Sequence, residues 1–503
     1  MALNGFNSRF GPLEILSETQ VREMHKSTLK VIGETGVNFH DEKALQVLND
    51  AGCKVDFDSH RVRFPEHVVM ENLAKAPSTF KVKARNSTND ITLSSGGPVY
   101  FGSSSGFRTI DLDTWEPKSP TRKDFYDFIK VLDYLPNVHQ ITAFPYFGFE
   151  GVPQMMGIIE ANAAKIRMSS KTQMEGAVHD NDKFTLPMAD AVGMDLCCLV
   201  NPAAPLSFYE TQVHGINRFS EADQPFHFAS GPVMGATAPV TIAGGVICPN
   251  VESIAGTVLA QLNKPGCRIW FGNYANEQNM STGSPSNGAI GNALHELVFN
   301  QMARYYKIPT WSSSSAWSSS KQIDFQAGYE AGMHAVLCAL AGASMVILQC
   351  SLTMQLVAHP VKAILDDDIA GMVGRLLEGV EINEETMAVD LINKVGPIPG
   401  MFLDQAHTRK WYKTEQYVPA MADKMPYGEW VKHGSKNALA HAREKFEEIL
   451  ATHNPDPLTP QQDQEIEDIL KDARQYYRKK GMISDEEWKV YEKDLGSPNY
   501  PYA

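Results

Sequence analysis

The feature that most constrains the fold of this chain is the alternation of short apolar runs with longer helical patterns between residues 98 and 349. Strands that alternate with helices pair in parallel through right-handed crossovers, and eight such units close into a (β/α)8, or TIM, barrel of the α/β class. The eight expected strands are PVYFGS from 98, VHQITAF at 138–144, TQMEGA at 172–177, PLSFYE at 205–210, FHFASG at 226–231, RIWFGN at 268–273, TWSSSS at 310–315 and SMVILQ at 344–349.

An open, doubly wound parallel sheet is the alternative arrangement of the same elements. A sheet of that kind usually carries a glycine-rich phosphate-binding fingerprint after a strand. The only candidate segment, GPVMGATAPVTIAGG at 231–245, has irregularly spaced glycines and no GK[ST] motif. The barrel is therefore the favoured prediction.

The segments on either side of the barrel differ from it in pattern. Residues 1–95 predict a layer of helices and a hairpin, beginning with a capping box in which Ser17 precedes Gln20 by three positions. Residues 96–380 form the expected barrel with the active site. Residues 381–503 predict a proline-punctuated wrap followed by a charged helical tail, whose charges are typical of solvated helix faces.

Composition and charge exclude several classes of protein. The net charge of -14 argues against a nucleic-acid surface, which needs clustered positive charge. The seven cysteines show no CxxC spacing, which indicates reduced thiols and no zinc site; we expect no bound metal. No apolar leader and no run of ~18 apolar residues is present. We therefore expect a cytoplasmic protein without a membrane span.

If the barrel is correct, the active site lies in the loops that follow the strands. The most unusual of these loops is WSSSSAWSSSK at 311–321, where Trp311 and Trp317 stand among seven serines. Large aromatic faces beside small hydroxyl groups indicate the wall of a binding pocket.

Further aromatic residues fall in or beside the same loops, among them Tyr146, Phe149 and Tyr274. A box of aromatic rings can hold a quaternary ammonium group, because ring quadrupoles attract a cation that donates no hydrogen bonds. Ordinary core packing is the alternative for each ring. Asn273 and Tyr274 offer amide and phenol donors for a substrate carboxylate or carbonyl.

Two carboxylates, Glu175 and Glu210, close expected strands and are the candidate catalytic residues. They could face one cavity and balance a cation, or each could be held structurally by neighbouring donors. His359 and His407 are candidate substrate-binding residues, although a lone histidine is often a satisfied structural side chain. No HExxH, GxSxG or dinucleotide fingerprint is present.

Four blocks of the sequence together resemble the trimethylamine methyltransferase superfamily, in its members that lack pyrrolysine. They are MGATAPVTIAGGVICPNVESIAGTVLAQLNKPGCRIWFG, QMARYYKIPTWSSSSAWSSSKQIDFQAGYE, ALAGAS with AILDDDI, and DQAHTRKWYK through MPYGEWVKHGSK. The resemblance extends from about residue 10 to about residue 450 and implies a (β/α)8 barrel. It matches SSSK at 318–321 to the segment that follows pyrrolysine, which places Trp317 at the pyrrolysine position.

This resemblance implies transfer of a methyl group from a methylated amine to the Co(I) of a separate corrinoid protein. Without pyrrolysine, a quaternary amine such as glycine betaine is the expected substrate, because its demethylation expels a neutral amine that needs no proton. Cobalamin would be supplied by the partner, so no tightly bound cofactor is expected, and a homo-oligomer is possible. Alternatives are a lyase that uses Glu175 or Glu210 as general base, and a non-catalytic betaine-binding protein.

Overall fold

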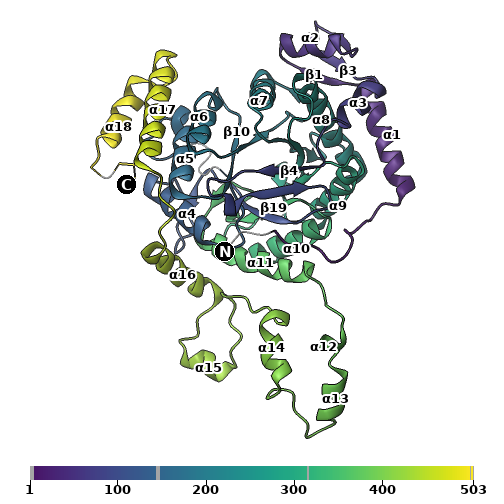
Figure 1. Ribbon diagram of the computed structural model, residues 1–503. Helices are drawn as coiled ribbons and strands as arrows, with labels where there is room; N and C mark the ends of the chain where they lie inside the picture. Colours follow the sequence, from purple (N-terminus) through teal and green to yellow (C-terminus); the bar gives the residue numbers. More distant parts are fainter. Residues whose placement is uncertain (1–4, 143–147, 314–316, 499, 502–503) are drawn as a thin grey trace.

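A computed structural model describes residues 5–142, 148–313, 317–498 and 500–501 of the chain (Figure 1). Its centre is a closed barrel of eight parallel strands, which confirms the predicted (β/α)8 fold. Neighbouring strands follow the order β10, β11, β13, β15, β18, β19, β6 and β9 around the barrel. Their bounds are β6 (Tyr100–Ser103), β9 (Gln140–Thr142), β10 (Thr172–Gly176), β11 (Leu196–Val200), β13 (Phe226–Ser230), β15 (Ile269–Asn273), β18 (Thr310–Ser312) and β19 (Met345–Gln349).

One of the eight predicted strands was wrong. The fourth barrel strand is β11, LCCLV, whose continuous apolar run suits a parallel strand covered on both sides. The predicted run at 205–210 instead contributes β12 (Ser207–Phe208), which pairs in parallel with β1 (Val37–Phe39) of a small sheet outside the barrel. Its alternating polar and apolar residues fit this half-exposed position.

Eight helices surround the barrel, and the outer faces of the strands pack against them. They are α4 (Arg122–Tyr134), α5 (Gln154–Met168), α6 (Asp182–Val192), α7 (Glu210–Glu221), α8 (Ile242–Asn263), α9 (Ile290–Tyr305), α10 (Phe325–Leu340) and α11 (Pro360–Leu377). Helix α8 is long and apolar enough to cross a membrane, with a mean hydropathy of 1.4 in its most apolar window. Because 72% of that window is buried inside the protein, α8 is a core helix.

The interior of the barrel is filled with large side chains. His227 lies between Trp270 and Trp311, with ring centroids 5.4 and 4.8 Å away. A hairpin of β4 (Thr79–Val82) and β5 (Ile91–Ser94) covers the end of the barrel from which the strands start, and its Phe80 stacks on Trp270 at 5.6 Å. Open space in the barrel therefore lies toward the carboxyl ends of the strands.

The N-terminal segment packs on the outside of the barrel near α8 (Figure 1). The predicted capping box at Ser17 and Gln20 is confirmed at the start of α1 (Glu18–Glu34). Gly36 follows the helix with φ +77, and a β-carbon there would lie 2.2 Å from the carbonyl oxygen of Val62, so only glycine fits. The remaining elements of this segment are α2 (Glu42–Asp50), β2 (Lys54–Asp56), β3 (Arg61–Arg63), α3 (Glu66–Leu73) and the 3-10 helix η1 (Ser87–Asn89).

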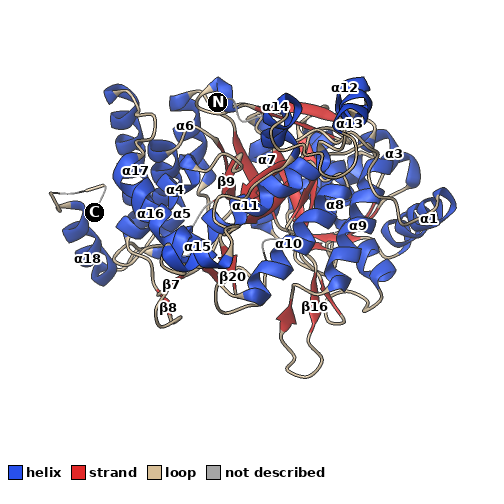
Figure 2. Ribbon diagram, turned by 90° about the horizontal axis from the view of Figure 1, so that it is seen from below, coloured by secondary structure: helices blue, strands red, loops and turns tan. Residues whose placement is uncertain are grey.

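Two short hairpins and a small three-stranded sheet line the rim at the carboxyl ends of the strands, at the lower edge of Figure 2. They are formed by β7 (Thr109–Ile110) with β8 (Pro117–Lys118), by β14 (Val233–Met234), β16 (Asn276–Gln278) and β17 (Pro285–Ser286), and by β20 (Ser351–Leu352) with β21 (Val357–Ala358). These elements frame the mouth of the barrel.

The C-terminal segment has two parts. Helices α12 (Glu384–Met387), α13 (Val389–Val395), α14 (Ala406–Glu415) and α15 (Tyr427–Lys432) project from the body, whereas α16 (Ala438–Thr452), α17 (Pro460–Lys479) and α18 (Asp485–Leu495) lie against it (Figure 1). The latter part is more buried than its charge pattern predicted, because Tyr477 and Tyr491 are fully enclosed.

A buried ionic cluster joins this C-terminal part to the barrel helices. Glu160 of α5 accepts hydrogen bonds from Arg122 of α4 at 2.8 Å and from Arg474 of α17 at 3.3 Å. The hydroxyl group of Tyr491 also donates to Glu160, and Arg122 donates to Asp494 of α18 at 2.6 Å. The tail is thus fixed to the barrel by charges removed from water.

Candidate active site

A cavity of about 250 Å³ opens at the carboxyl ends of the barrel strands. Its lining comes from strand ends and the loops that follow them: Ser103, Ser104, Ser105, Phe107, Thr142, Met174, Glu175, Gly176, Leu199, Asn201, Tyr274, Trp311, Trp317, Ile347 and Gln355. Most of this surface is apolar or aromatic, and neither lysine nor arginine stands among the described lining residues. The site therefore lies where the barrel prediction placed it.

Three aromatic residues predicted from the sequence meet in this cavity. Trp311 points into the barrel from β18, and Tyr274 and Trp317 lie with ring centroids 4.9 Å apart and planes inclined at 52°. Tyr274 lies so close to Gly231 that a β-carbon there would be 1.8 Å from its ring. The side-chain amide of Asn201 forms a hydrogen bond with the Tyr274 hydroxyl group. The aromatic wall is therefore positioned by its neighbours.

The loop after Trp317 is held by its serines. Glu330 of α10 accepts hydrogen bonds from the Ser318 hydroxyl group at 2.6 Å and the Ser319 amide at 2.9 Å, and Ser320 donates to Asp324 at 2.9 Å. The described serines of this loop stay outside the cavity lining, contrary to the predicted hydroxyl wall. Residues 314–316 lie outside the described part of the chain.

Glu330 was not singled out from the sequence, although a signal was present. It occupies the inward stripe of α10 with Ala327, Ala331 and His334, at spacings of three and four residues. A carboxylate in such a stripe requires buried donors, and the serine loop supplies them.

Two residues of the cavity lining carry buried polar atoms without partners. The hydroxyl group of Ser104 and the indole N–H of Trp311 are buried, and neither has a hydrogen-bond partner among the described residues. Buried polar groups are normally satisfied, so these two atoms are exceptions beside the cavity wall. Ser104 was not among the site residues predicted from the sequence.

The two candidate catalytic carboxylates lie apart. Glu175 lines the cavity, but its carboxylate accepts hydrogen bonds from Asn162 at 2.6 Å, Thr185 at 2.7 Å and Asn181 at 3.0 Å, on α5, on α6 and beside α6. Burial raises the pKa of Glu175 to about 8, and these donors and Lys165 oppose that shift. These contacts hold the Glu175 side chain in place at the cavity wall.

Glu210 occupies a different environment. It is the first residue of α7, its side chain is 73% exposed, and it borders a second cavity of about 200 Å³. Because 205–210 forms no barrel strand, the expectation that Glu210 closes such a strand was wrong. The structure does not bring the two carboxylates to one cavity.

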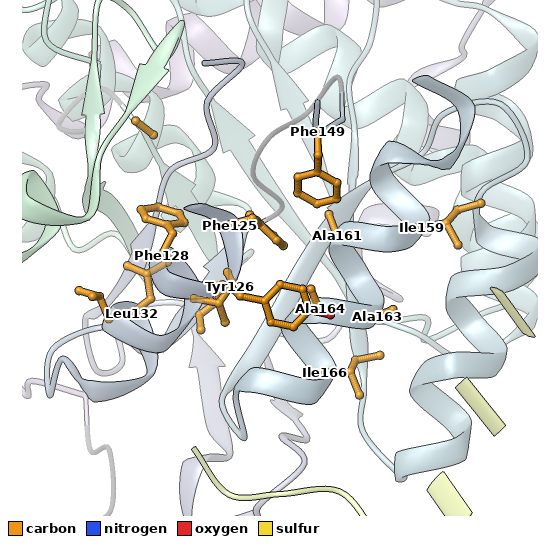
Figure 3. Packing of buried hydrophobic residues seen from close by; sticks show 14 of the residues in the cluster. Phe125, Tyr126, Phe128, Leu132, Phe149, Ile159, Ala161, Ala163, Ala164 and Ile166 are labelled. Carbon is orange, nitrogen blue, oxygen red and sulfur yellow. The ribbon is translucent and has the colours of Figure 1, made fainter. Parts of the chain in front are cut away.

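Phe149 and Asn273 point away from the candidate site. Phe149 packs into the core cluster between α4 and α5, 5.0 Å from Phe125 (Figure 3). Asn273 is fully buried, and its amide forms a 2.9 Å hydrogen bond with Nδ1 of His295 on α9. Tyr146 lies outside the described residues.

The two candidate histidines lie in structural positions. Nε2 of His407 on α14 forms a 3.1 Å hydrogen bond with the carbonyl oxygen of Glu385. Both residues lie in the part of the C-terminal segment that projects from the body. His359 caps the N-terminus of α11, where Nδ1 accepts from the Val361 amide at 3.1 Å. Burial lowers the pKa of His359 to about 4, so the ring is neutral near pH 7. No group of three potential metal ligands occurs in the described ranges.

We expect His359→Ala to lower the free energy of unfolding by about 1 kcal/mol and leave KM for the substrate unchanged, because alanine removes an N-cap acceptor. His359→Asn should keep most of the stability, since asparagine is a good N-cap. Denaturant unfolding and steady-state kinetics check both variants. A raised KM in the stable asparagine variant would show that His359 contributes to substrate binding.

Stability should also depend on the charge of His359. Because its folded pKa lies below the ordinary value of 6.5, its contribution is present above that value and is lost as the pH falls toward about 4. The alanine variant should lack this part of the pH dependence.

The comparisons with known proteins agree with this geometry. Residues 2–476 match the family model for trimethylamine methyltransferase (MTTB). Glycine betaine methyltransferase of Desulfitobacterium hafniense is 31% identical over 468 residues, covering 91% of this chain and 96% of the relative. Trimethylamine methyltransferase MttB of Methanosarcina thermophila is 27% identical over 492 residues, covering 94% and 99%.

The fold also has a solved counterpart. The monomethylamine methyltransferase MtmB of Methanosarcina barkeri superposes with a TM-score of 0.50 at 12% sequence identity, covering 88% of this chain and 90% of that one. At this identity the likeness concerns the fold alone. The family match over most of the chain, with the relative that is 31% identical, shows that the chain belongs to the trimethylamine methyltransferase (MTTB) family and is a methyltransferase that acts in corrinoid-dependent methyl transfer.

Proposed function

We propose that this enzyme transfers a methyl group from glycine betaine, or a closely similar quaternary amine, to the Co(I) of a separate corrinoid protein. The observation that carries the proposal is the cavity in which Trp311, Trp317 and Tyr274 meet without a lysine or arginine among the described lining residues. The name of the relative that is 31% identical supports the same substrate.

The cavity has features suited to both ends of a betaine. Aromatic faces attract a trimethylammonium group, and this attraction strengthens where water is excluded. Polar side chains of the lining, such as Ser105, Asn201 and Gln355, offer donors for the carboxylate.

Demethylation of a quaternary amine requires little acid–base catalysis from the protein. The corrinoid of the partner supplies a nucleophilic Co(I), and the electron pair of the broken C–N bond leaves with the amine, which departs neutral. The role of this chain is to hold the cation, exclude water and aim one methyl group out of the barrel mouth. A separate carboxylate pair is not needed for these steps.

We expect the enzyme to hold no tightly bound cofactor, because the corrinoid acts as the second substrate. The seven free cysteines are consistent with a reducing cytoplasmic location.

The decisive experiment follows methyl-Co(III) formation by visible absorbance with reduced corrinoid protein or free cob(I)alamin. Glycine betaine, carnitine, proline betaine, butyrobetaine and trimethylamine are compared as donors. We expect turnover with a quaternary amine and none with trimethylamine. Calorimetric binding of a betaine without methyl loss would favour the binding-protein alternative, and turnover without corrinoid would favour the lyase.

A further inference from the structure

Glu330 of α10 is a buried carboxylate at the mouth of the barrel that stays outside the cavity wall. It is 5% exposed and is not among the described residues that line the cavity. Its Oε2 atom accepts hydrogen bonds from the Ser318 hydroxyl group at 2.6 Å and from the Ser319 amide at 2.9 Å. Both donors directly follow Trp317 in the chain. A charged acceptor strengthens such hydrogen bonds, and burial keeps water from replacing them.

The same loop is held on a second side by the turn that precedes α9. The hydroxyl group of Ser319 donates to the carbonyl oxygen of Asn287 at 2.7 Å, and the Asn287 amide donates to that hydroxyl group at 3.0 Å. Gly288 follows with φ +91, and a β-carbon there would lie 2.4 Å from the carboxyl carbon of Glu330. The Glu330 carboxylate therefore lies against this turn as well as against the loop.

The loop also supports a strained stretch of backbone between β20 and β21. The Thr353 amide donates to the carbonyl oxygen of Ser320 at 2.9 Å. The Met354 amide donates to the carbonyl oxygen of Ser318, also at 2.9 Å. These two residues and Gln355 have φ values of 51, 55 and 70. The left-handed region is unfavourable for residues other than glycine, so three in succession persist only where their surroundings hold them.

Gln355 connects this stretch of backbone to the cavity. Its side chain lines the cavity and donates a hydrogen bond to the hydroxyl group of Ser105, another lining residue. Trp317, which also lines the cavity, directly precedes Ser318. The carboxylate of Glu330 is thus linked through one short loop to two residues of the cavity wall, one aromatic and one polar.

Helix α10 does not depend on Glu330 for its own start. Asp324 caps the helix by accepting a hydrogen bond from the Ala327 amide at 2.9 Å. Ala331 and Ala335 pack the same helix into the apolar core around β6 and β19. Loss of the Glu330 carboxylate would therefore release the loop and leave α10 folded.

We propose that Glu330 is a positioning residue for methyl transfer, which fixes Trp317 and Gln355 in the cavity wall without touching the substrate. Methyl transfer requires the donor to be held in one orientation toward the cobalt, so a displaced wall lowers the rate even when the fold is intact. The inference rests on the proposed function only for the identity of the methyl donor.

The kinetic test compares Glu330→Ala with Glu330→Gln, using whichever amine of the donor panel the wild type demethylates. The alanine variant should lower kcat/KM by about a hundredfold. Glutamine keeps an oxygen that accepts from Ser318 and Ser319, so that variant should stay within about tenfold of wild type. In a Trp317→Ala background, Glu330→Ala should cost about tenfold or less, because both changes disturb the same ring.

Hydrogen exchange separates this role from a general loss of structure and needs no turnover. In Glu330→Ala, the amides of residues 317–322 and 351–356 should exchange at least about tenfold faster, while those of α10 keep their wild-type rates. The matched control is Gln326→Ala, which removes only the hydrogen bond that Gln326 donates to Oε1 of Glu330 at 2.8 Å. Its kcat/KM should stay within about threefold of wild type.

Four results would overturn the proposal: full activity of Glu330→Ala, losses that multiply fully with those of Trp317→Ala, unchanged exchange in both loops, or a Gln326→Ala loss as large as that of Glu330→Ala. Faster exchange throughout α10 would likewise show that Glu330 stabilises the helix and not the loop. If the wild type demethylates only a tertiary amine, the proposed substrate is wrong, and the same variants still test Glu330 with that donor.

Discussion

Trp317→Ala is expected to lower kcat/KM for methyl transfer from glycine betaine by about two orders of magnitude. Loss of a desolvated cation–π contact removes up to about 2 kcal/mol, and the missing ring also opens the cavity beside Tyr274 to water. About 1.4 kcal/mol corresponds to a factor of ten in rate. The measurement is the initial rate of methyl-Co(III) formation across betaine concentrations.

Two controls separate the aromatic face from simple volume. Trp317→Phe keeps a ring in the cavity and should recover much of the activity lost in the alanine variant. The isostere 3,3-dimethylbutanoate, in which an uncharged tert-butyl group replaces trimethylammonium, should bind wild type more weakly than betaine does. Trp317→Ala should reduce that difference, because the electrostatic attraction of the ring acts only on the cation. Equal kcat/KM in wild type and Trp317→Ala would show that Trp317 does not contribute to the binding site.

The barrel could be predicted because strand and helix periodicities repeat along most of the chain. The error at the fourth strand has a physical origin. LCCLV is apolar on both faces and resembles part of a longer buried segment, whereas PLSFYE alternates and looks like an independent strand. Its actual partner is β1, some 170 residues away in the chain (Asn38 opposite Ser207), and sequence alone does not reveal such a pairing.

Position along a strand was predictable, but the direction of each side chain was not. Trp311 points into the barrel, whereas Asn273 at the end of a neighbouring strand points outward to His295. Successive residues of a strand face opposite sides. If the position of a residue in the strand is uncertain by one, the sequence does not show whether its side chain faces the cavity or the surrounding core. The direction of the Phe149 side chain, which lies in a loop, could not be predicted either, because the packing of α4 and α5 decides its position (Figure 3).

Glu160→Gln is expected to release the C-terminal helices from the barrel. The carboxylate lies between Arg122 and Arg474, and removing one partner of a buried ion pair typically costs about 3–5 kcal/mol. Glutamine would leave both guanidinium groups without that charge in a buried cluster. Limited proteolysis between α16 and α17 measures the undocking, and we expect cleavage to be faster by at least about a hundredfold, because the open form becomes more populated.

The control is an exposed pair in the same segment. Arg478 and Asp485 lie 3.4 Å apart with the Asp485 side chain 90% exposed, so Asp485→Asn should change stability by less than about 1 kcal/mol. Equal protection of wild type and Glu160→Gln would show that aromatic packing alone fixes the tail.

The pH dependence of docking tests the charge itself. Burial would raise the pKa of Glu160, but the guanidinium groups of Arg122 and Arg474 outweigh burial and hold it below its ordinary value of 4.5. For a carboxyl group whose folded pKa is depressed, the stabilisation is full above the unfolded value and is lost as the pH falls through the folded one. Protection of the wild-type tail should therefore decline below about pH 4.5, measured by an acid-tolerant protease. Glu160→Gln has no such charge to lose, so its tail should be cleaved rapidly at neutral pH and gain little further sensitivity in acid.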